Sequence, residues 1–249
     1  MIIAVDTRFL VKNESNRYSN FIYETFKRIT SLHKEHTFIF IFDTPFDASV
    51  IFSENVISVI KGPRVKRPAQ WLIWYNIKIP SVLKKYKADV FISFDFCSLT
   101  TKVPQCIIIN DLSFLVYPSK NHLFFYKKFT PRSLKKTKAI VTVSEFSKAD
   151  IIKQYKIDAD KIKVVYNGID ETFAPINFEE RKNIKEKYAD GNEYFIYTGE
   201  LQEKNNLLNL LKAFSAFKKR QKSNMQLLIA GNAGSQYEEL LENLRLFRF

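Results

Sequence analysis

Polar residues directly follow the β-like apolar runs in the first two thirds of the chain, and their side chains could do chemistry. In an open parallel sheet, ligands bind outside the carboxyl ends of the strands, so these residues would gather at one edge. Any one of them taken alone is better explained as part of a turn or a helix cap, and Ser144 is a good N-cap. As a group they favour a binding site for a polar or anionic substrate. The residues are Asp6-Thr7-Arg8, Asp95, Asn110-Asp111, Ser144-Glu145 and Asn167-Gly168.

A second candidate site lies near residue 200. Gly199 ends an apolar run, and Lys204 follows shortly before a helical pattern begins. A glycine turn, a lysine and a helix N-terminus together are suited to holding a phosphate. Many strand–helix turns look the same and a single lysine is usually solvated, so these residues also fit an ordinary turn.

Other kinds of site are disfavoured by residue type and spacing. Asp158 and Asp160 have the spacing of a cation-binding pair, but they fall in a polar turn expected at the opposite edge of the sheet. His33 and His36 are one helical turn apart without a third ligand nearby, which indicates a helix end. Only Gly62 precedes residue 168, so the first two thirds of the chain contain no glycine-rich phosphate loop.

The elements that would position these side chains alternate along the chain. Short β-rich runs separated by longer helical patterns predict βαβ units and a parallel sheet, and continuous apolar runs such as Cys-Ile-Ile-Ile suit a sheet covered on both faces. The predicted strands are residues 2–5, 37–42, 56–60, 90–94, 105–109, 139–143 and 163–166. The predicted helices are residues 17–32, 70–86, 123–136 and 145–155.

The pattern changes after the Asn167-Gly168 turn, where Pro175 and a charged stretch predict an interdomain connection over residues 171–190 with a short helix. A new βαβ pattern follows, with strands at 194–198 and 226–230 and helices at 207–220 and 237–246. We therefore expect an α/β protein. Its first domain, residues 1–170, is a doubly wound, Rossmann-like parallel sheet, and residues 191–249 form an incomplete second Rossmann-like domain.

The net charge is strongly positive. With 39 Lys and Arg against 26 Asp and Glu, it is +13 at pH 7, which favours anionic partners such as nucleic acid, a membrane surface or an anionic substrate. Residues 61–87 and 120–138 are basic, free of acidic residues and interleaved with aromatics. Such stretches fit a helix at an anionic lipid surface, a nucleic-acid groove, or aromatics facing the core and lysines facing water. Of the two partners, we expect peripheral membrane contact rather than nucleic acid.

The sequence carries no sign of export. It opens directly as a strand, without a basic segment ahead of an apolar one, and no apolar run approaches the roughly 18 residues that a membrane span needs. Cys97 and Cys106 lie in or beside apolar runs and read as reduced interior thiols. We expect a cytoplasmic protein with peripheral contact to the inner face of the cell membrane.

Several segments together resemble family 4 (group 1) glycosyltransferases of GT-B fold, and their order and spacing are more specific than any one of them. They are Asp6-Thr7-Arg8, Val103-Pro104, Ile107-Ile-Ile-Asn-Asp-Leu112, Ile140-Val-Thr-Val-Ser-Glu-Phe-Ser147, Lys163-Val-Val-Tyr-Asn-Gly-Ile-Asp170, the Gly199 to Leu207 segment and Leu228-Ile-Ala-Gly231.

The resemblance implies transfer of a sugar from a nucleotide-sugar donor to a glycan or lipid-linked acceptor, in the assembly of cell-envelope polysaccharide. It implies no metal ion and no cofactor, since the nucleotide sugar is a substrate. The first domain would hold the acceptor and the second the donor. The acceptor-side candidates are Arg8, Arg17, Asn110, Asp111, Ser144 and Glu145, and the donor-phosphate candidates are Gly199, Lys204 and Asn205.

The chain also departs from the family's pattern. Asn110 stands where the family has a histidine, Asn205 stands at its donor-loop lysine, and the sequence ends before the family's Glu-x7-Glu segment. We therefore expect the chain by itself to be a poor catalyst, because donor positioning and charge stabilisation supply much of the acceleration. The alternative is a catalytically inactive, truncated remnant that only binds an acceptor, a membrane or a partner protein.

Overall fold

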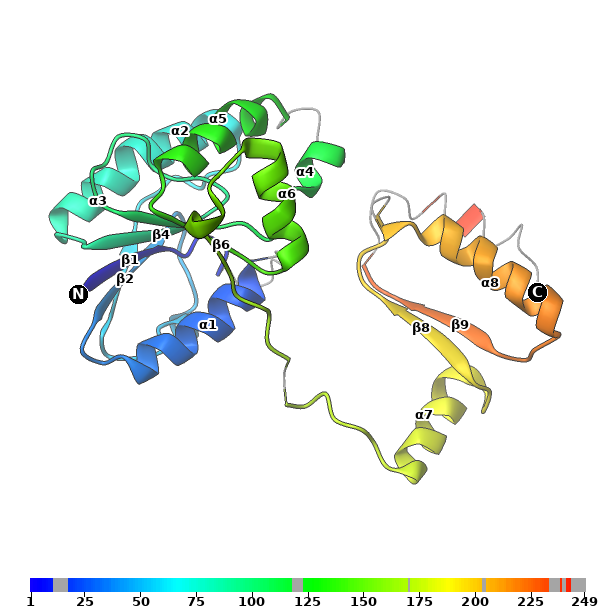
Figure 1. The fold of residues 1–249 in the computed structure, drawn as a ribbon. Coiled ribbons are helices and arrows are strands. Elements are labelled where there is room, and N and C mark those ends of the chain that lie inside the picture. Colours follow the sequence, from blue (N-terminus) through cyan, green and yellow to red (C-terminus); the bar gives the residue numbers. More distant parts are fainter. Residues whose placement is uncertain are drawn as a thin grey trace. The chain divides into compact units, whose positions relative to one another are not determined.

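The structure is a computed structural model that describes residues 1–10, 18–117, 123–169, 171–202, 205–232, 238 and 241–242. Its contacts divide the chain into two compact units, Met1–Gly168 and Ile169–Phe249. The first unit runs from blue to green in Figure 1, and the second from yellow-green to red.

The first unit contains a seven-stranded sheet in which all neighbouring strands are parallel. The strand order is β3-β2-β1-β4-β5-β6-β7, so it reverses direction between β1 and β4. The strands are β1 (Ile2–Asp6), β2 (Thr37–Phe42), β3 (Val56–Ile60), β4 (Val90–Phe94), β5 (Gln105–Ile108), β6 (Ala139–Thr142) and β7 (Ile162–Val164). The prediction of a doubly wound parallel sheet is confirmed, and the predicted strands differ from these mainly at their ends.

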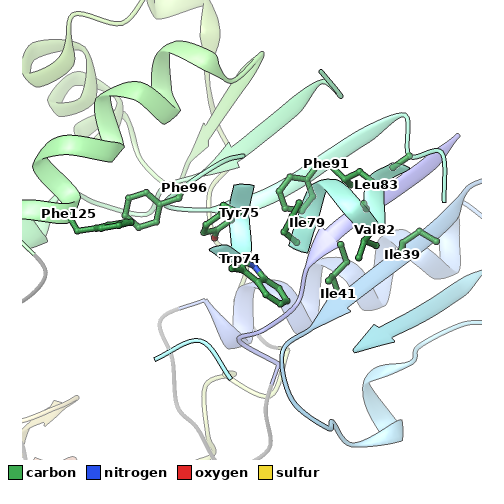
Figure 2. Close-up of a cluster of buried hydrophobic side chains, with 12 residues drawn as sticks. Ile39, Ile41, Trp74, Tyr75, Ile79, Val82, Leu83, Phe91, Phe96 and Phe125 are labelled. Carbon is green, nitrogen blue, oxygen red and sulfur yellow. The ribbon is translucent and has the colours of Figure 1, made fainter. Parts of the chain in front are cut away.

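Helices cover both faces of this sheet, as its continuous apolar strands require. Helix α1 (Ser19–Leu32) lies on one face and packs on Phe38, Phe40 and Phe42 of β2. The opposite face carries Ile39 and Ile41, which lie beside Val82 of α3 (Ile79–Lys85) (Figure 2). Helices α2 (Pro68–Ile73) and α5 (Leu123–Lys136) join the same hydrophobic cluster through Trp71 and Phe125, and Phe125 packs on Phe96 (Figure 2). The remaining helices are α4 (Ser113–Val116), α6 (Glu145–Tyr155) and the 3-10 turns η1 (Ala48–Val50) and η3 (Ala159–Lys161).

The helix predicted over residues 70–86 is interrupted by a π-helix, η2 (Trp74–Lys78), between α2 and α3. Pro80 has no backbone N–H, so it cannot donate to the carbonyl of Asn76 four residues earlier. That carbonyl accepts a hydrogen bond from Thr100 Oγ1 instead, at 2.8 Å. The widened turn moves Trp74 and Tyr75 out of the register of a continuous α-helix, and both are buried. Such π-turns are frequent at functional sites.

Both cysteines are free thiols. Burial raises the pKa of Cys97 and of Cys106 to about 11 in each case. At neutral pH both therefore stay protonated, and neither has the thiolate that a nucleophile or metal ligand needs.

The second unit contains the predicted βαβ pattern. It consists of α7 (Phe178–Ala189), β8 (Tyr194–Thr198), α8 (Leu207–Gln221) and β9 (Gln226–Ala230), with β8 and β9 parallel. Helix α7 begins with a capping box between Asn177 and Glu180, and Gln226 Nε2 donates to the carbonyl of Ala189 at its end. The helix expected within the 171–190 connection thus contacts β9, while the proposed domains 1–170 and 191–249 stay predictions. The helix predicted over 237–246 falls mostly outside the described residues.

Within the described ranges, none of the helices combines the length and the apolar character needed to cross a bilayer.

Candidate functional site

The reversal of strand order between β1 and β4 brings polar side chains together at the carboxyl ends of these two strands. Asp6 is the last residue of β1, Thr7 and Arg8 follow it, and Asp95 follows β4. The two strands are direct neighbours, with Val5 opposite Ile92. Ligands bind at such a switch point in open α/β sheets, which makes it the first place to seek a site.

Arg8 is held there by a closed set of hydrogen bonds. Its Nε donates to Asp6 Oδ1 and its Nη2 donates to Asp6 Oδ2, both at 2.9 Å, which is a bidentate pair. Nη2 also donates to the Tyr75 hydroxyl at 2.9 Å, and that hydroxyl donates to Asp6 Oδ2 at 2.9 Å. The three side chains therefore fix one another.

Aromatic rings surround the same guanidinium. Its central carbon lies 5.0 Å from the ring centre of Trp74, 5.2 Å from that of Tyr75 and 5.4 Å from that of Phe9, within cation–π range. Trp74 and Tyr75 both come from the π-helix and lie on the sheet face shown in Figure 2.

The charges in this cluster are strongly coupled. Burial works against the charge on Arg8, but the carboxylate of Asp6, together with Tyr75 and Asp43, outweighs it and the pKa of Arg8 is raised. Burial and then the negative charge of Asp6 raise the pKa of the Tyr75 hydroxyl, which stays a neutral hydrogen-bond donor at physiological pH. Arg8 is therefore a permanent cation whose charge is largely matched by Asp6.

Asp95 has an unusual backbone at the end of β4. Its φ of 61° is left-handed, and the Phe96 amide donates to the Phe94 carbonyl at 2.7 Å across it, which makes a γ-turn centred on Asp95. The Tyr18 hydroxyl donates to Asp95 Oδ1. Asp95 is 8% exposed, so its carboxyl lies largely inside the protein.

The candidate residues at the ends of β5 and β6 make hydrogen bonds that stabilise nearby turns and helix starts. Asp111 Oδ1 accepts from the Ser113 amide at 2.8 Å, and the Asn110 carbonyl accepts from Ser147 Oγ at 2.8 Å. Ser144 is the N-cap of α6, its Oγ accepting from the Ser147 amide at 3.1 Å, and Glu145 is exposed in the first turn. Ser144 is thus a helix cap, and Asp111 makes a turn contact just before α4, the ordinary alternatives that their sequence positions left open.

The donor-side candidates lie in the second unit. Gly199 has a φ of 146°, and a Cβ at the neighbouring Gly231 would meet the Gly199 carbonyl oxygen at 1.7 Å, so only glycine at 231 allows this backbone approach. Asn205 Nδ2 donates to the Glu200 carbonyl at 2.7 Å and so ties the loop to itself ahead of α8. Lys204 and Arg17 lie outside the described residues.

The motifs set aside in the sequence have structural contacts. Asp158 Oδ1 caps the turn η3 by accepting from the Asp160 amide at 3.0 Å, and His33 Nδ1 lies 3.1 Å from a Glu35 oxygen where α1 ends. Throughout the described part of the chain, no three His, Cys, Asp or Glu side chains are grouped so as to hold a metal ion.

Sequence reasoning missed Tyr18, Trp74 and Tyr75. Tyr75 is 67 residues from Arg8, and Tyr18 is 77 residues from Asp95, so no local spacing connects these pairs. The one available signal was Pro80 inside a helical pattern, which marks a disturbed helix and directs attention to the turn before it.

Comparisons with known proteins agree with the resemblance noted in the sequence. Residues 19–173 match the family described as Glycosyltransferase Family 4, and residues 178–247 match Glycosyl transferases group 1. The chain is 26% identical over 141 residues to the O-antigen chain mannosyltransferase RfbU of Salmonella typhimurium. That alignment covers 56% of this chain and 38% of the relative.

Solved structures share the fold. WaaG, described as a glycosyltransferase involved in lipopolysaccharide biosynthesis, aligns with a TM-score of 0.64 at 13% identity, covering 99% of this chain and 68% of that one. Alr3699/HepE of Anabaena, solved with UDP-glucose, aligns with a TM-score of 0.63 at 12% identity, covering 99% and 65%. The chain thus spans about two thirds of these structures, and at such identities the likeness concerns the fold alone.

The first family match covers more than half of the chain and the second adjoins it. The parallel sheet and the βαβ unit that follows it agree with the fold of the similar structures. The chain therefore belongs to Glycosyltransferase Family 4, as the sequence motifs predicted.

Proposed function

We propose that this chain takes part in transferring a sugar from a nucleotide-sugar donor to a glycan or lipid-linked acceptor in cell-envelope polysaccharide assembly. Membership of a glycosyltransferase family supports the reaction class. A relative named as an O-antigen chain mannosyltransferase supports the pathway, and a similar structure solved with UDP-glucose supports the donor class.

The main support for an acceptor-binding site in the first unit is the group of polar residues at the switch point between β1 and β4. Asp6, Arg8 and Asp95 gather there from two neighbouring strands, in a buried site whose carboxylates and hydroxyls suit sugar hydroxyls. We assign Arg8, Arg17, Asn110, Asp111, Ser144 and Glu145 to the acceptor side of the reaction.

We propose that the loop beginning at Gly199 binds the nucleotide-sugar donor. The backbone of Gly231 lies close to the carbonyl of Gly199, in the loop that precedes α8. The N-terminus of a helix attracts phosphate, because its free N–H groups and its dipole favour negative charge. Lys204 and Asn205 belong to this loop, and Lys204 would contact the diphosphate as charge develops on it. These groups would act without a metal ion.

Peripheral membrane contact on the cytoplasmic face is proposed for the side of the first unit formed by α2 and α5. The Trp71 ring of α2 meets the Phe125 ring of α5 at 5.1 Å, so the two helices are neighbours. Many aromatics of the two basic stretches face the core, but Ile73, Ile77 and Phe124 are exposed. Phe124 precedes the exposed Lys127 and Lys128 by one helical turn.

The reaction class is tested by calorimetric titration of the purified 249-residue chain with UDP, GDP and the corresponding sugar nucleotides. We expect one of them to bind, Lys204→Ala to weaken it about tenfold because a charge-assisted contact is lost, and turnover to be low. Lys212→Ala, an exposed lysine on α8, is the matched control.

Binding that Lys204→Ala leaves intact would remove Lys204 from the site. If none of these nucleotides binds, the alternative applies, in which the chain binds only an acceptor, a membrane or a partner. The asparagines at 110 and 205, where the family has histidine and lysine, favour that second function.

A further inference from the structure

We propose that the loop between β3 and α2, residues 61–67, binds the phosphate or diphosphate group of a lipid-linked acceptor. The exposed side of α2 and η2, which follow the loop, would contact the first part of the acceptor's hydrocarbon chain. We call residues 61–67 the basic loop. The inference rests on the proposed function, because it gives the anionic end of that acceptor a place in the first unit.

The charge of the basic loop is the first observation. Its seven residues include Lys61, Arg64, Lys66 and Arg67 and no acidic residue. Lys66 and Arg67 are exposed and Lys61 is partly exposed, and none of these three forms an ion pair with another described residue. Cations without a counter-ion in the protein attract anionic ligands, and a group with two or more negative charges most strongly.

The backbone of the basic loop is held in place by two side chains. The Val65 amide donates to Oδ2 of the buried Asp43 at 2.7 Å. The amides of Lys66 and Arg67 both donate to Gln70 Oε1, each at 2.9 Å. The cations therefore project from a fixed backbone, and a preorganised site loses less entropy when a ligand binds. This suits one bound group at a defined place.

The position of the basic loop in the fold is the third observation. Lys61 directly follows β3, which pairs in parallel with β2, and β2 pairs in parallel with β1. The basic loop thus leaves the sheet at the same edge as Asp6 and Asp95. Ligands of open α/β sheets bind at this edge, outside the carboxyl ends of the strands. A phosphate held by the loop would lie at the edge that carries the acceptor-side candidates.

Exposed apolar side chains follow the basic loop directly. Ile73 is 49% exposed and Ile77 is 62% exposed, while Trp74 and Tyr75 between them are buried. The two isoleucines are four residues apart on a continuous helical segment, so they lie about one turn apart. A hydrocarbon chain would bury them, whereas a free phosphate would leave them in water. A basic loop followed by an apolar helix side therefore favours an anion that carries a hydrocarbon chain.

Paired substitutions test the charge of the loop. Lys66→Gln with Arg67→Gln removes two exposed cations, while the backbone amides of both residues keep their acceptor on Gln70. Lys84→Gln with Lys85→Gln is the matched control, because it removes two exposed cations from the end of α3, away from the loop. Urea unfolding of both variants checks that the fold is retained.

A third variant tests the apolar side. Ile73→Gln with Ile77→Gln removes the exposed apolar surface and keeps residues that favour a helix. The wild-type chain and the three variants are titrated by calorimetry with farnesyl diphosphate, inorganic diphosphate and farnesol. Tryptophan fluorescence reports where the ligand lies, because the two tryptophans of the chain, Trp71 and Trp74, are in α2 and η2.

We expect farnesyl diphosphate to bind at least about tenfold more tightly than inorganic diphosphate or farnesol. Lys66→Gln with Arg67→Gln should weaken this binding at least about tenfold, because two charge-assisted contacts are lost. Lys84→Gln with Lys85→Gln should change it by about twofold or less. In Ile73→Gln with Ile77→Gln, the advantage of farnesyl diphosphate over inorganic diphosphate should shrink.

The proposal is overturned if farnesyl diphosphate does not bind, if inorganic diphosphate binds equally well, or if the loop and control variants lose equal affinity. Sedimentation with phosphatidylserine vesicles distinguishes the other source of phosphate, the lipid headgroup. We expect the loop variant to lose more affinity for farnesyl diphosphate than for vesicles, and an equal loss would assign the loop to the membrane surface instead. The nucleotide titrations decide the donor side separately, so failure here leaves the proposed reaction class standing.

Discussion

The guanidinium of Arg8 is a charge placed inside the first unit, where removal from water is costly and only close pairing compensates. Asp6 supplies the opposite charge in bidentate geometry, and Tyr75 supplies a third partner. Lysine could not replace this arginine, because an ammonium lacks the planar pair of donors that matches a carboxylate.

Removal of the Arg8 charge should therefore destabilise the first unit. Arg8→Met leaves the buried Asp6 carboxylate without its cation, and we expect a loss of about 3 kcal/mol in the free energy of unfolding, measured in urea. Arg28→Met is the control, because its ion pair with Glu24 is exposed and contributes about 0.5 kcal/mol or less. Equal losses in the two variants would contradict this account of the cluster.

At the scale of elements, the ends and interruptions of helices decide what each candidate residue does. The π-turn before Pro80 brings Trp74 and Tyr75 to Arg8. Ser144 is engaged as the N-cap of α6. A residue at the carboxyl end of a strand is often also the first residue of a helix, so capping and binding compete for the same side chain.

Substitutions of Ser144 measure how much its capping role contributes to stability. Ser144→Ala removes the acceptor for the Ser147 amide, and we expect a loss of about 1 kcal/mol in unfolding free energy. Ser144→Asp retains a cap and should restore most of it. Thermal and urea unfolding of the three proteins measure this, and wild-type stability in Ser144→Ala would mean that the cap contributes nothing.

At the scale of the whole molecule, two compact units share one chain with a net charge of +13. In the first unit, the exposed Phe124 of α5 lies in a helix whose Lys127, Lys128 and Arg132 are also exposed. Apolar and basic side chains on one helix are what a protein needs to rest on an anionic lipid surface.

We expect weak binding to vesicles containing anionic phosphatidylserine, and less to neutral phosphatidylcholine vesicles. Each basic residue near the surface contributes about 1 kcal/mol, which salt screens. Lys127→Glu with Lys128→Glu should thus lower vesicle affinity at least about tenfold in a sedimentation assay. Lys182→Glu with Lys187→Glu on α7 is the matched control. Equal binding to neutral and anionic vesicles would show that the surface does not act in this way.

The local elements of this protein could be predicted from its sequence. Strands β2, β3 and β4, helices α5 and α6, and the pair β8 and β9 begin and end where the patterns predicted. Hydrophobic periodicity, caps and turn residues act over a few positions, so they can be read in a single stretch. The family motifs could be read for the same reason, since each is a short run of residues.

The partners of the site residues were decided only by the tertiary structure. The sequence indicated that Arg8 and Asp95 follow strands, but not that β1 lies beside β4, nor that Tyr75 closes on Arg8 and Tyr18 on Asp95. These contacts join residues 67 and 77 positions apart. They depend on the order of strands in the sheet and on a helical turn widened before Pro80. Neither is a local property, because both arise from packing between segments that meet only when the chain folds.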